Sequence, residues 1–200
     1  GFPSFQPLMK FYHSEREAGR LAAEIQHDVE VILFTGEIPY QWAVQDAKYH
    51  VPVQFIPLTG TGLYRAFYRL RKKGCVTEIS TDSIEETSIK QVYEELDETP
   101  EHLLVNEARF RPDREKLIEF HQKAYEDGQV KAAITGIKSV SRELDRLGIP
   151  NEWVYPSEQD IIVALERALL STESRRSKES QIVVGLVNID DFHRLAEQKS

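Results

Sequence analysis

Residues 130–155 read VKAAITGIKSVSRELDRLGIPNEWVY, and this stretch decides the fold class. Apolar runs at 130–135 and 152–155 predict two buried strands. The segment between them carries apolar residues at helical spacing, namely Ile137, Val140, Leu144 and Leu147. Gly148 is typical of a helix end in the left-handed conformation. A strand, a helix and a strand in this order predict a crossover between two parallel strands.

The same alternation of strands and helices extends outward along the whole chain. It predicts an α/β fold, with parallel sheets flanked by helices. Helical spacing recurs at 18–25, 63–70 and 161–169. Strands are predicted at residues 5–12, 29–34, 53–58, 75–81, 102–106, 130–135, 152–155 and 181–187.

The glycines fall into two groups. Gly74, Gly128 and Gly148 each follow a helical stretch, where a residue without a Cβ suits the helix end. A second group, Gly36, Gly60, Gly62 and Gly136, lies just beyond the ends of apolar strands and before helices. Open α/β sheets bind ligands beyond the carboxyl ends of their strands, so the second group marks candidate binding turns.

Composition excludes several function classes. The chain has 33 acidic and 25 basic residues and a net charge of −8, which disfavours direct binding of nucleic acid. The single Cys75 cannot form an internal disulfide, and no histidine or cysteine spacing indicates a metal site. The sequence shows no signal peptide or membrane span, so we expect a cytoplasmic protein. Gly60 and Gly62 lack the third glycine of a dinucleotide fingerprint, and no cofactor is expected.

From Val29 to about Leu170 the chain resembles the N-terminal sensor domain of the propionate-catabolism activator family of bacterial transcription regulators. The stretches that carry the resemblance are VILFTG at 31–36, VPVQFI at 51–56, AAITG at 132–136 and VYPS at 154–157, with the helices between them. The resemblance implies a two-lobed α/β module with Rossmann-like sheets and a cleft like that of periplasmic binding proteins. We expect a lobe boundary near 59–62 and a return near 156.

The tail looks like the start of a different domain. Residues 171–180 are polar and charged and are expected to form a linker. Residues 181–200 resemble the first strand and helix of a GGDEF-type domain, with Asn188 in place of the usual metal-binding aspartate. The resemblance therefore implies a degenerate domain without cyclase activity. The strand at 181–187 is expected to lack a partner within this chain.

The strand-end turns supply the candidate binding residues. Their hydroxyl groups and helix starts suit a polar or anionic metabolite, and three nearby cations, Arg109, Arg111 and Lys138, could reach an anion. The candidate ligand-binding residues are Thr35, Gly36, Glu37, Thr59, Gly60, Thr61, Arg109, Thr135, Gly136 and Lys138.

Three functions remain open from the sequence. The first is a small-molecule sensor of a regulator, which forms a homodimer and contacts DNA only through another domain. The second is a two-lobed enzyme similar to racemases and decarboxylases, which use cysteines at strand ends; Cys75 opens a strand and does not match. The third is a ligand-free dimerisation scaffold, with Tyr64, Tyr68 and Arg71 on one stripe of a helix as the candidate dimer face.

Overall fold

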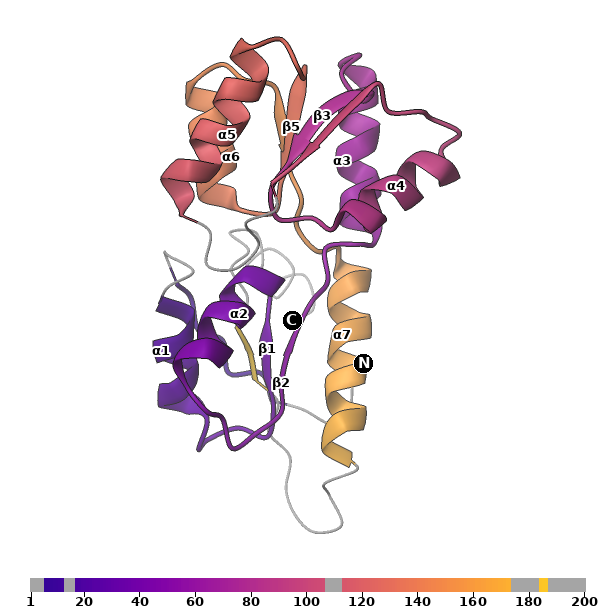
Figure 1. Ribbon diagram of the computed structural model, residues 1–200. Coiled ribbons are helices and arrows are strands. Elements are labelled where there is room, and N and C mark those ends of the chain that lie inside the picture. Colours follow the sequence, from indigo (N-terminus) through magenta and orange to yellow (C-terminus); the bar gives the residue numbers. More distant parts are fainter. Residues whose placement is uncertain (1–5, 13–16, 107–112, 174–183, 187–200) are drawn as a thin grey trace, which may run out of the picture. The chain divides into compact units, whose positions relative to one another are not determined.

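The computed structural model describes residues 6–12, 17–106, 113–173 and 184–186. The chain divides into two compact units, which are treated separately here. Unit 1 comprises Gly1–Ile56 and Ile162–Ser200, and unit 2 comprises Pro57–Ile161. Both contain a parallel sheet with helices, which confirms the predicted α/β fold (Figure 1).

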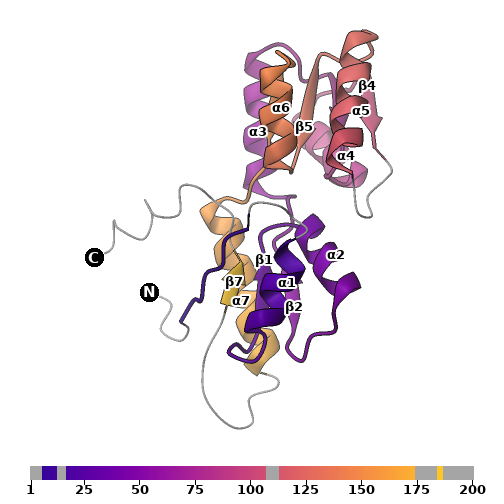
Figure 2. The ribbon, with the colours of Figure 1, turned by 90° about the vertical axis from the view of Figure 1, so that its left-hand side faces the viewer.

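Unit 2 contains a four-stranded parallel sheet. Its strands β3 (Glu78–Thr81), β4 (His102–Val105), β5 (Ala132–Thr135) and β6 (Asn151–Trp153) follow the order β4-β3-β5-β6. Helices α5 (Arg114–Glu126) and α6 (Lys138–Arg146) cover one face of this sheet. Helices α3 (Thr61–Lys72) and α4 (Glu86–Glu95) cover the other face (Figures 1 and 2). The carboxyl ends of all four strands therefore lie at one edge of the sheet.

The main core of unit 2 lies between its sheet and helices α3 and α4. The rings of Phe67 and Tyr93 meet edge to face, with their centroids 5.0 Å apart. The Tyr93 hydroxyl donates a 2.6 Å hydrogen bond to the Val76 carbonyl oxygen, and burial raises the pKa of this tyrosine. The aromatic residue on α4 thereby fixes both a helix and the loop before β3.

Unit 1 contains a three-stranded parallel sheet in the order β2-β1-β7. The strands are β1 (Ile32–Phe34), β2 (Val53–Phe55) and β7 (Val184–Leu186). Helices α1 (Glu17–Ile25) and α2 (Glu37–Asp46) pack against each other within this unit. Helix α7 (Glu158–Glu173) begins in unit 2 and belongs to unit 1 from Ile162 onward.

Two segments differ from the sequence-based expectations. The strand predicted at 5–12 is wrong for the described residues 6–12, in which only Pro7 makes an isolated β-bridge. Pro7 lacks a backbone donor, and Leu8 and Phe11 are exposed. The strand predicted at 181–187 does form over Val184–Leu186, but it pairs with β1 of the same chain, since β1 offers a second edge opposite β2. The GGDEF-like assignment of 181–200 stays a prediction, because residues 181–183 and 187–200 lie outside the described residues.

The predicted helix-ending glycines are confirmed. Gly74, Gly128 and Gly148 have φ angles of 70°, 69° and 72°, in the left-handed region that favours glycine. None of the helices in the described part of the chain is long and apolar enough to span a membrane.

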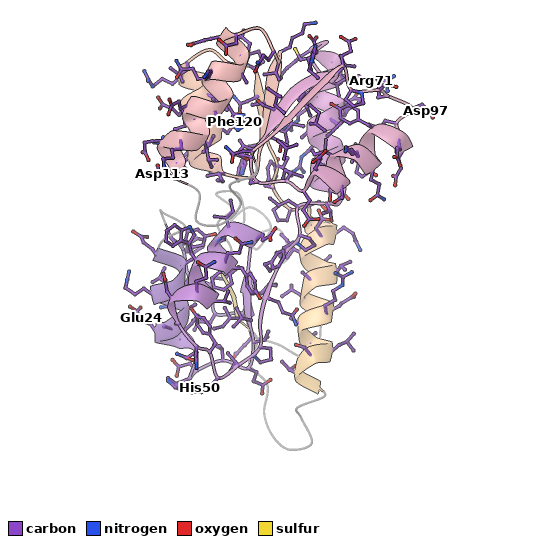
Figure 3. All side chains as sticks on the ribbon, viewed as in Figure 1. Glu24, His50, Arg71, Asp97, Asp113 and Phe120 are labelled. Carbon is purple, nitrogen blue, oxygen red and sulfur yellow. The ribbon has the colours of Figure 1, made fainter. Side chains whose placement is uncertain are left out.

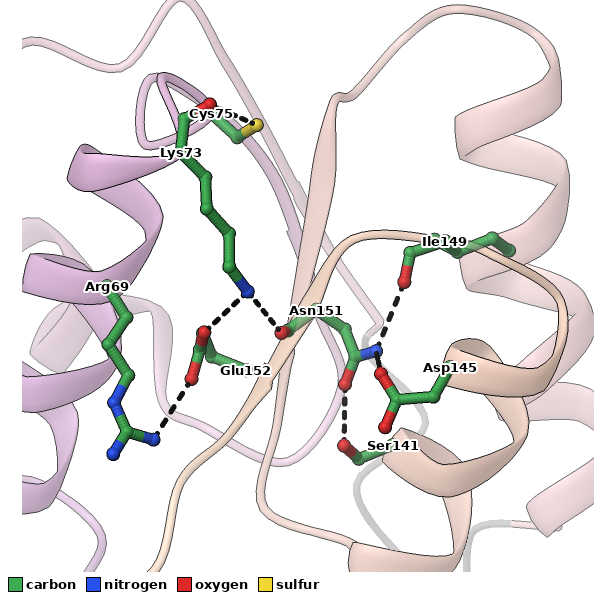
Figure 4. A network of polar contacts seen from close by, with 8 residues as sticks. All are labelled: Arg69, Lys73, Cys75, Ser141, Asp145, Ile149, Asn151 and Glu152. Atoms are coloured by element: carbon green, nitrogen blue, oxygen red, sulfur yellow. Dashed lines mark hydrogen bonds and ion pairs between the residues drawn. The ribbon is translucent and has the colours of Figure 1, made fainter.

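A polar network ties the amino end of β6 to the helices on both faces (Figure 4). The buried Glu152 carboxylate lies 2.7 Å from Lys73 Nζ and 3.4 Å from an Arg69 nitrogen at the end of α3. The neighbouring Asn151 bonds to the Ser141 hydroxyl (2.5 Å) and to the Asp145 carboxylate (2.8 Å) of α6. The polar side chains of Asn151 and Glu152, at the amino edge of the sheet, are thus paired within the chain. No candidate binding residue lies among them.

We expect Gly62→Ala to destabilise the fold by about 2 kcal/mol, because the added Cβ would overlap the Tyr155 carbonyl oxygen. Gly36→Ala is the matched control. Its backbone is extended (φ −169°, ψ 169°) and an added Cβ would meet only Pro39 Cδ, at 3.9 Å. Urea unfolding of the two variants measures the difference. Equal stability would contradict the close approach of α3 to residue 155.

Candidate functional site

Four chain segments meet at the carboxyl edge of the unit 2 sheet. A Cβ added to Gly136 would contact Leu58 and Ser83, so the turns after β5, before α3 and after β3 touch one another. The indole nitrogen of Trp153, at the end of β6, donates to the Gly136 carbonyl oxygen at 3.2 Å. The topology therefore brings together residues that are distant in sequence. The strand-end glycines predicted such a meeting for the turns at 59–62 and 135–136.

Asp82 is the centre of this arrangement. It follows β3 directly and is 3% exposed. Its Oδ2 accepts a 2.8 Å hydrogen bond from the Thr135 hydroxyl, and its Oδ1 accepts a 2.6 Å bond from Ser83. The Ser83 oxygen in turn accepts the Gly136 backbone N–H at 2.6 Å. One buried carboxylate thus fixes the conformation of two neighbouring strand-end turns.

His121 joins helix α5 to the same network. Its Nδ1 lies 2.8 Å from the Ser80 hydroxyl, and its Nε2 lies 3.3 Å from Asp82 Oδ2, without the alignment of a hydrogen bond. Serine, histidine and aspartate are the residue types of a hydrolase triad. Ser80 and His121 are both fully buried, however, and a nucleophile must reach its substrate. The cluster is therefore positioned to hold the edge of the sheet in shape, not to perform nucleophilic catalysis.

Two cations and two aromatic rings lie beside this network. The Arg65 guanidinium carbon is 3.8 Å from the centre of the Tyr155 ring, and Lys138 Nζ is 5.0 Å from the centre of the Trp153 ring. The two rings are 4.7 Å apart and tilted by 36°. All four side chains are partly exposed. The carboxyl edge therefore offers positive charge held on aromatic faces.

Two of the helices that begin at this edge, α3 and α6, lack a capping bond from the side chain of the N-cap residue. Neither Gly60, before α3, nor Ile137, before α6, makes a side-chain capping bond. Helix α5 differs, because the Asp113 carboxylate accepts the Glu115 backbone N–H at 3.1 Å (Figure 3). The Asp160 carboxylate lies against Gly60 and accepts hydrogen bonds from the backbone N–H and the hydroxyl group of Ser157. Backbone N–H groups at helix starts favour negative charge, so this edge suits an anion more than a cation.

The structure places the candidate residues in different surroundings. Thr59 and Thr61 are exposed at the start of α3. Gly60 faces Asp160, Thr135 and Gly136 bond within the Asp82 network, and Lys138 lies on Trp153.

The remaining candidates belong to unit 1 or lie outside the described residues. Thr35 shares a 3.1 Å hydrogen bond with the Tyr12 hydroxyl, and the Glu37 carboxylate accepts one of 2.8 Å from Gln41. Gly36 begins α2. Arg109 lies outside the described residues, as does Arg111.

Sequence reasoning missed Arg65, Asp82, His121, Trp153 and Tyr155. The polar run Ser80-Thr81-Asp82-Ser83 at the end of an apolar strand was the available signal for Asp82. No signal identified His121, because only the fold brings α5 next to β3.

The single cysteine of the chain does not lie at this edge. Cys75 precedes β3, so it lies toward the amino end of the sheet, where it packs against the core. Within the described ranges, no group of three or more histidine, cysteine, aspartate or glutamate side chains is placed to hold a metal ion.

Comparison with known proteins identifies fold relatives only. No protein-family model and no curated protein matches the sequence. Among solved structures, an NtrC family transcriptional regulator from Clostridium acetobutylicum superposes with a TM-score of 0.58 at 20% identity, covering 80% of each chain. Unliganded arylmalonate decarboxylase matches with a TM-score of 0.33 at 12% identity, covering 78% of this chain and 75% of the other. The first match supports the α/β regulator-like fold; the second is too weak to carry an argument.

We expect Asp82→Ala to lower the free energy of unfolding by about 3 kcal/mol, because it leaves the Ser83 and Thr135 hydroxyls without their buried acceptor and removes the carboxylate beside His121. Asp127→Ala, at an exposed helix end of the same unit, is the matched control and should change stability by less than about 0.5 kcal/mol. Chemical unfolding followed by circular dichroism measures both. Equal effects would show that the Asp82 network does not stabilise the sheet edge.

Proposed function

We propose that this chain is the small-molecule-sensing part of a bacterial regulator, and that it binds a polar or anionic metabolite at the carboxyl edge of the unit 2 sheet. The observation that carries the proposal is the meeting of four strand-end segments beside Arg65 and Lys138. Ligands of open α/β sheets bind at this edge. The fold shared with an NtrC family transcriptional regulator supports the regulatory role.

In this proposal the candidate residues contribute to binding in different ways. The exposed Thr59 and Thr61 present hydroxyl groups, and the starts of α3 and α6 present backbone N–H groups. Lys138 supplies positive charge. Thr135 acts indirectly, because its hydroxyl already donates to Asp82 and accepts the Ile137 N–H at 3.0 Å. A ligand also bound by Thr35, Gly36, Glu37 and Arg109 stays a prediction from the sequence.

Helix α7 is the proposed route from the site to the rest of the protein. Its first turn forms a capping box, in which Ser157 and Asp160 exchange hydrogen bonds of 2.8 and 3.2 Å. The same Asp160 carboxylate lies against Gly60 at the start of α3. A ligand that moves this turn would displace the end of a helix that continues into unit 1. Binding would then shift the population between two arrangements of the chain by its differential affinity for them.

The proposal also includes the oligomeric state and the cellular location of the protein. We propose a cytoplasmic homodimer that contacts DNA only through another domain. The outer face of α3 supports the dimer, because Tyr68 is 58% exposed with Lys72 Nζ 4.8 Å from its ring centre. Two other members of the expected dimer stripe bond within unit 2. Tyr64 donates to Glu95, and Arg71, labelled in Figure 3, lies 3.2 Å from Glu98. The Tyr64 bond lowers the pKa of Glu95 below its usual value.

The test is recovery of a bound small molecule. The purified chain is incubated with a bacterial metabolite extract and washed, and the released compounds are identified by mass spectrometry. We expect one polar or anionic compound in stoichiometric amount. Its affinity, measured by titration calorimetry, should fall about fivefold in Thr59→Val, the cost of roughly one neutral hydrogen bond.

Thr87→Val is the matched control, since Thr87 is an exposed threonine on α4 of the same unit. Its affinity for the recovered compound should be unchanged. Recovery of no compound would favour the scaffold, and chemical conversion of the recovered compound by the chain would favour the enzyme.

A further inference from the structure

We propose that Arg65 binds the carboxylate group of the sensed molecule, and that Tyr155 holds the guanidinium in position for it. The inference rests on the proposed function and narrows the ligand to a carboxylic acid. Arg65 lies one turn into α3, and Tyr155 follows β6, so both belong to the carboxyl edge of the unit 2 sheet.

Two contacts fix the Arg65 side chain. The guanidinium lies over the Tyr155 ring, 3.8 Å from its centre, and one terminal nitrogen donates a 2.9 Å hydrogen bond to the Tyr155 carbonyl oxygen. The same nitrogen is 3.6 Å from the position of a Cβ on Gly62. A side chain held in this way loses little conformational entropy when it binds a ligand.

The charge of Arg65 is unpaired among the described residues. On the same helix, Arg69 and Arg71 lie 3.4 and 3.2 Å from the carboxylates of Glu152 and Glu98. Among the residues that the structure describes, no carboxylate forms an ion pair with Arg65, although the Arg65 side chain is partly buried. Partial burial weakens the hydration of a cation, so a positioned guanidinium without a counter-charge favours an incoming anion.

The chemistry of the surroundings selects a carboxylate among anions. After the bond to Tyr155, the guanidinium keeps further N–H donors in its plane, and a planar carboxylate accepts two of them side by side. The Asp160 carboxylate lies against Gly60, the residue that precedes the first turn of α3. Its negative charge repels a doubly charged phosphate more strongly than a singly charged carboxylate. Lys138, over the neighbouring Trp153 ring, adds a second positive charge.

The experiment follows the Arg65 side chain directly. The ¹⁵N-labelled chain is titrated with acetate, succinate, benzoate and, separately, inorganic phosphate, each up to about 10 mM. The Arg65 Nε–H signal is assigned by its loss in Arg65→Lys. We expect at least one of the carboxylates to shift this signal to saturation. In Arg65→Lys the affinity for that carboxylate should fall about tenfold, because lysine offers neither the planar fork nor the stacking contact.

Arg69→Lys is the matched control, since it makes the same change on the same helix at a residue that pairs with Glu152. Its affinity for the carboxylate should be unchanged. The proposal is overturned if no carboxylate shifts the Arg65 signal, if phosphate alone shifts it, or if both variants bind equally well. Recovery of a polar metabolite from the extract together with any of these results would reject the role of Arg65 while leaving the sensor function in place.

Discussion

The Asp82 carboxylate is the constraint on which the candidate site depends. It is buried at the end of β3, and it accepts hydrogen bonds from Ser83, in the turn after β3, and from Thr135, the last residue of β5. Burying a carboxylate is costly unless donors surround it, so the turns after β3 and β5 are held in the one conformation that supplies those donors. Through Ser83 the constraint reaches the Gly136 N–H, and through His121 it reaches helix α5.

This rigid edge carries the more exposed groups that a ligand could touch. Gly136 accepts the Trp153 indole N–H through its carbonyl oxygen, and Trp153 contacts Tyr155, on which Arg65 rests. This series of contacts leads from the buried Asp82 carboxylate to the partly exposed Arg65 guanidinium. A binding site built on supported side chains needs less reorganisation when a ligand arrives. At the opposite edge, the buried Glu152 carboxylate is paired with Arg69 and Lys73.

Local patterns predicted the parts of the fold that depend on local physics. Alternating apolar runs predicted the parallel strands, and the glycines at 74, 128 and 148 marked helix ends that need a positive φ. The strand predicted at 5–12 does not extend over the described residues 6–12, where Pro7 lacks a backbone donor and Phe11 is exposed. The pairing of β7 with β1 could not be foreseen, because it depends on which edge of a sheet is open.

The site was predicted only where it follows from topology. The role of the strand-end glycines in binding stays a prediction, and packing explains Gly60 and Gly136, which face Asp160 and Leu58. Asp82 and His121 were missed because their importance arises from a contact between β3 and α5. Arg65 was missed because one arginine among several on a basic helix stands out only when the partners of the others are known.

A crystal structure of the chain with the metabolite it retains from a bacterial extract tests the central claim most directly. We predict electron density for the molecule at the carboxyl edge of the unit 2 sheet, within hydrogen-bonding distance of Thr59 or Arg65 and outside the unchanged Asp82 network. Density for the molecule elsewhere, with this edge unchanged and in contact only with solvent, would contradict the account.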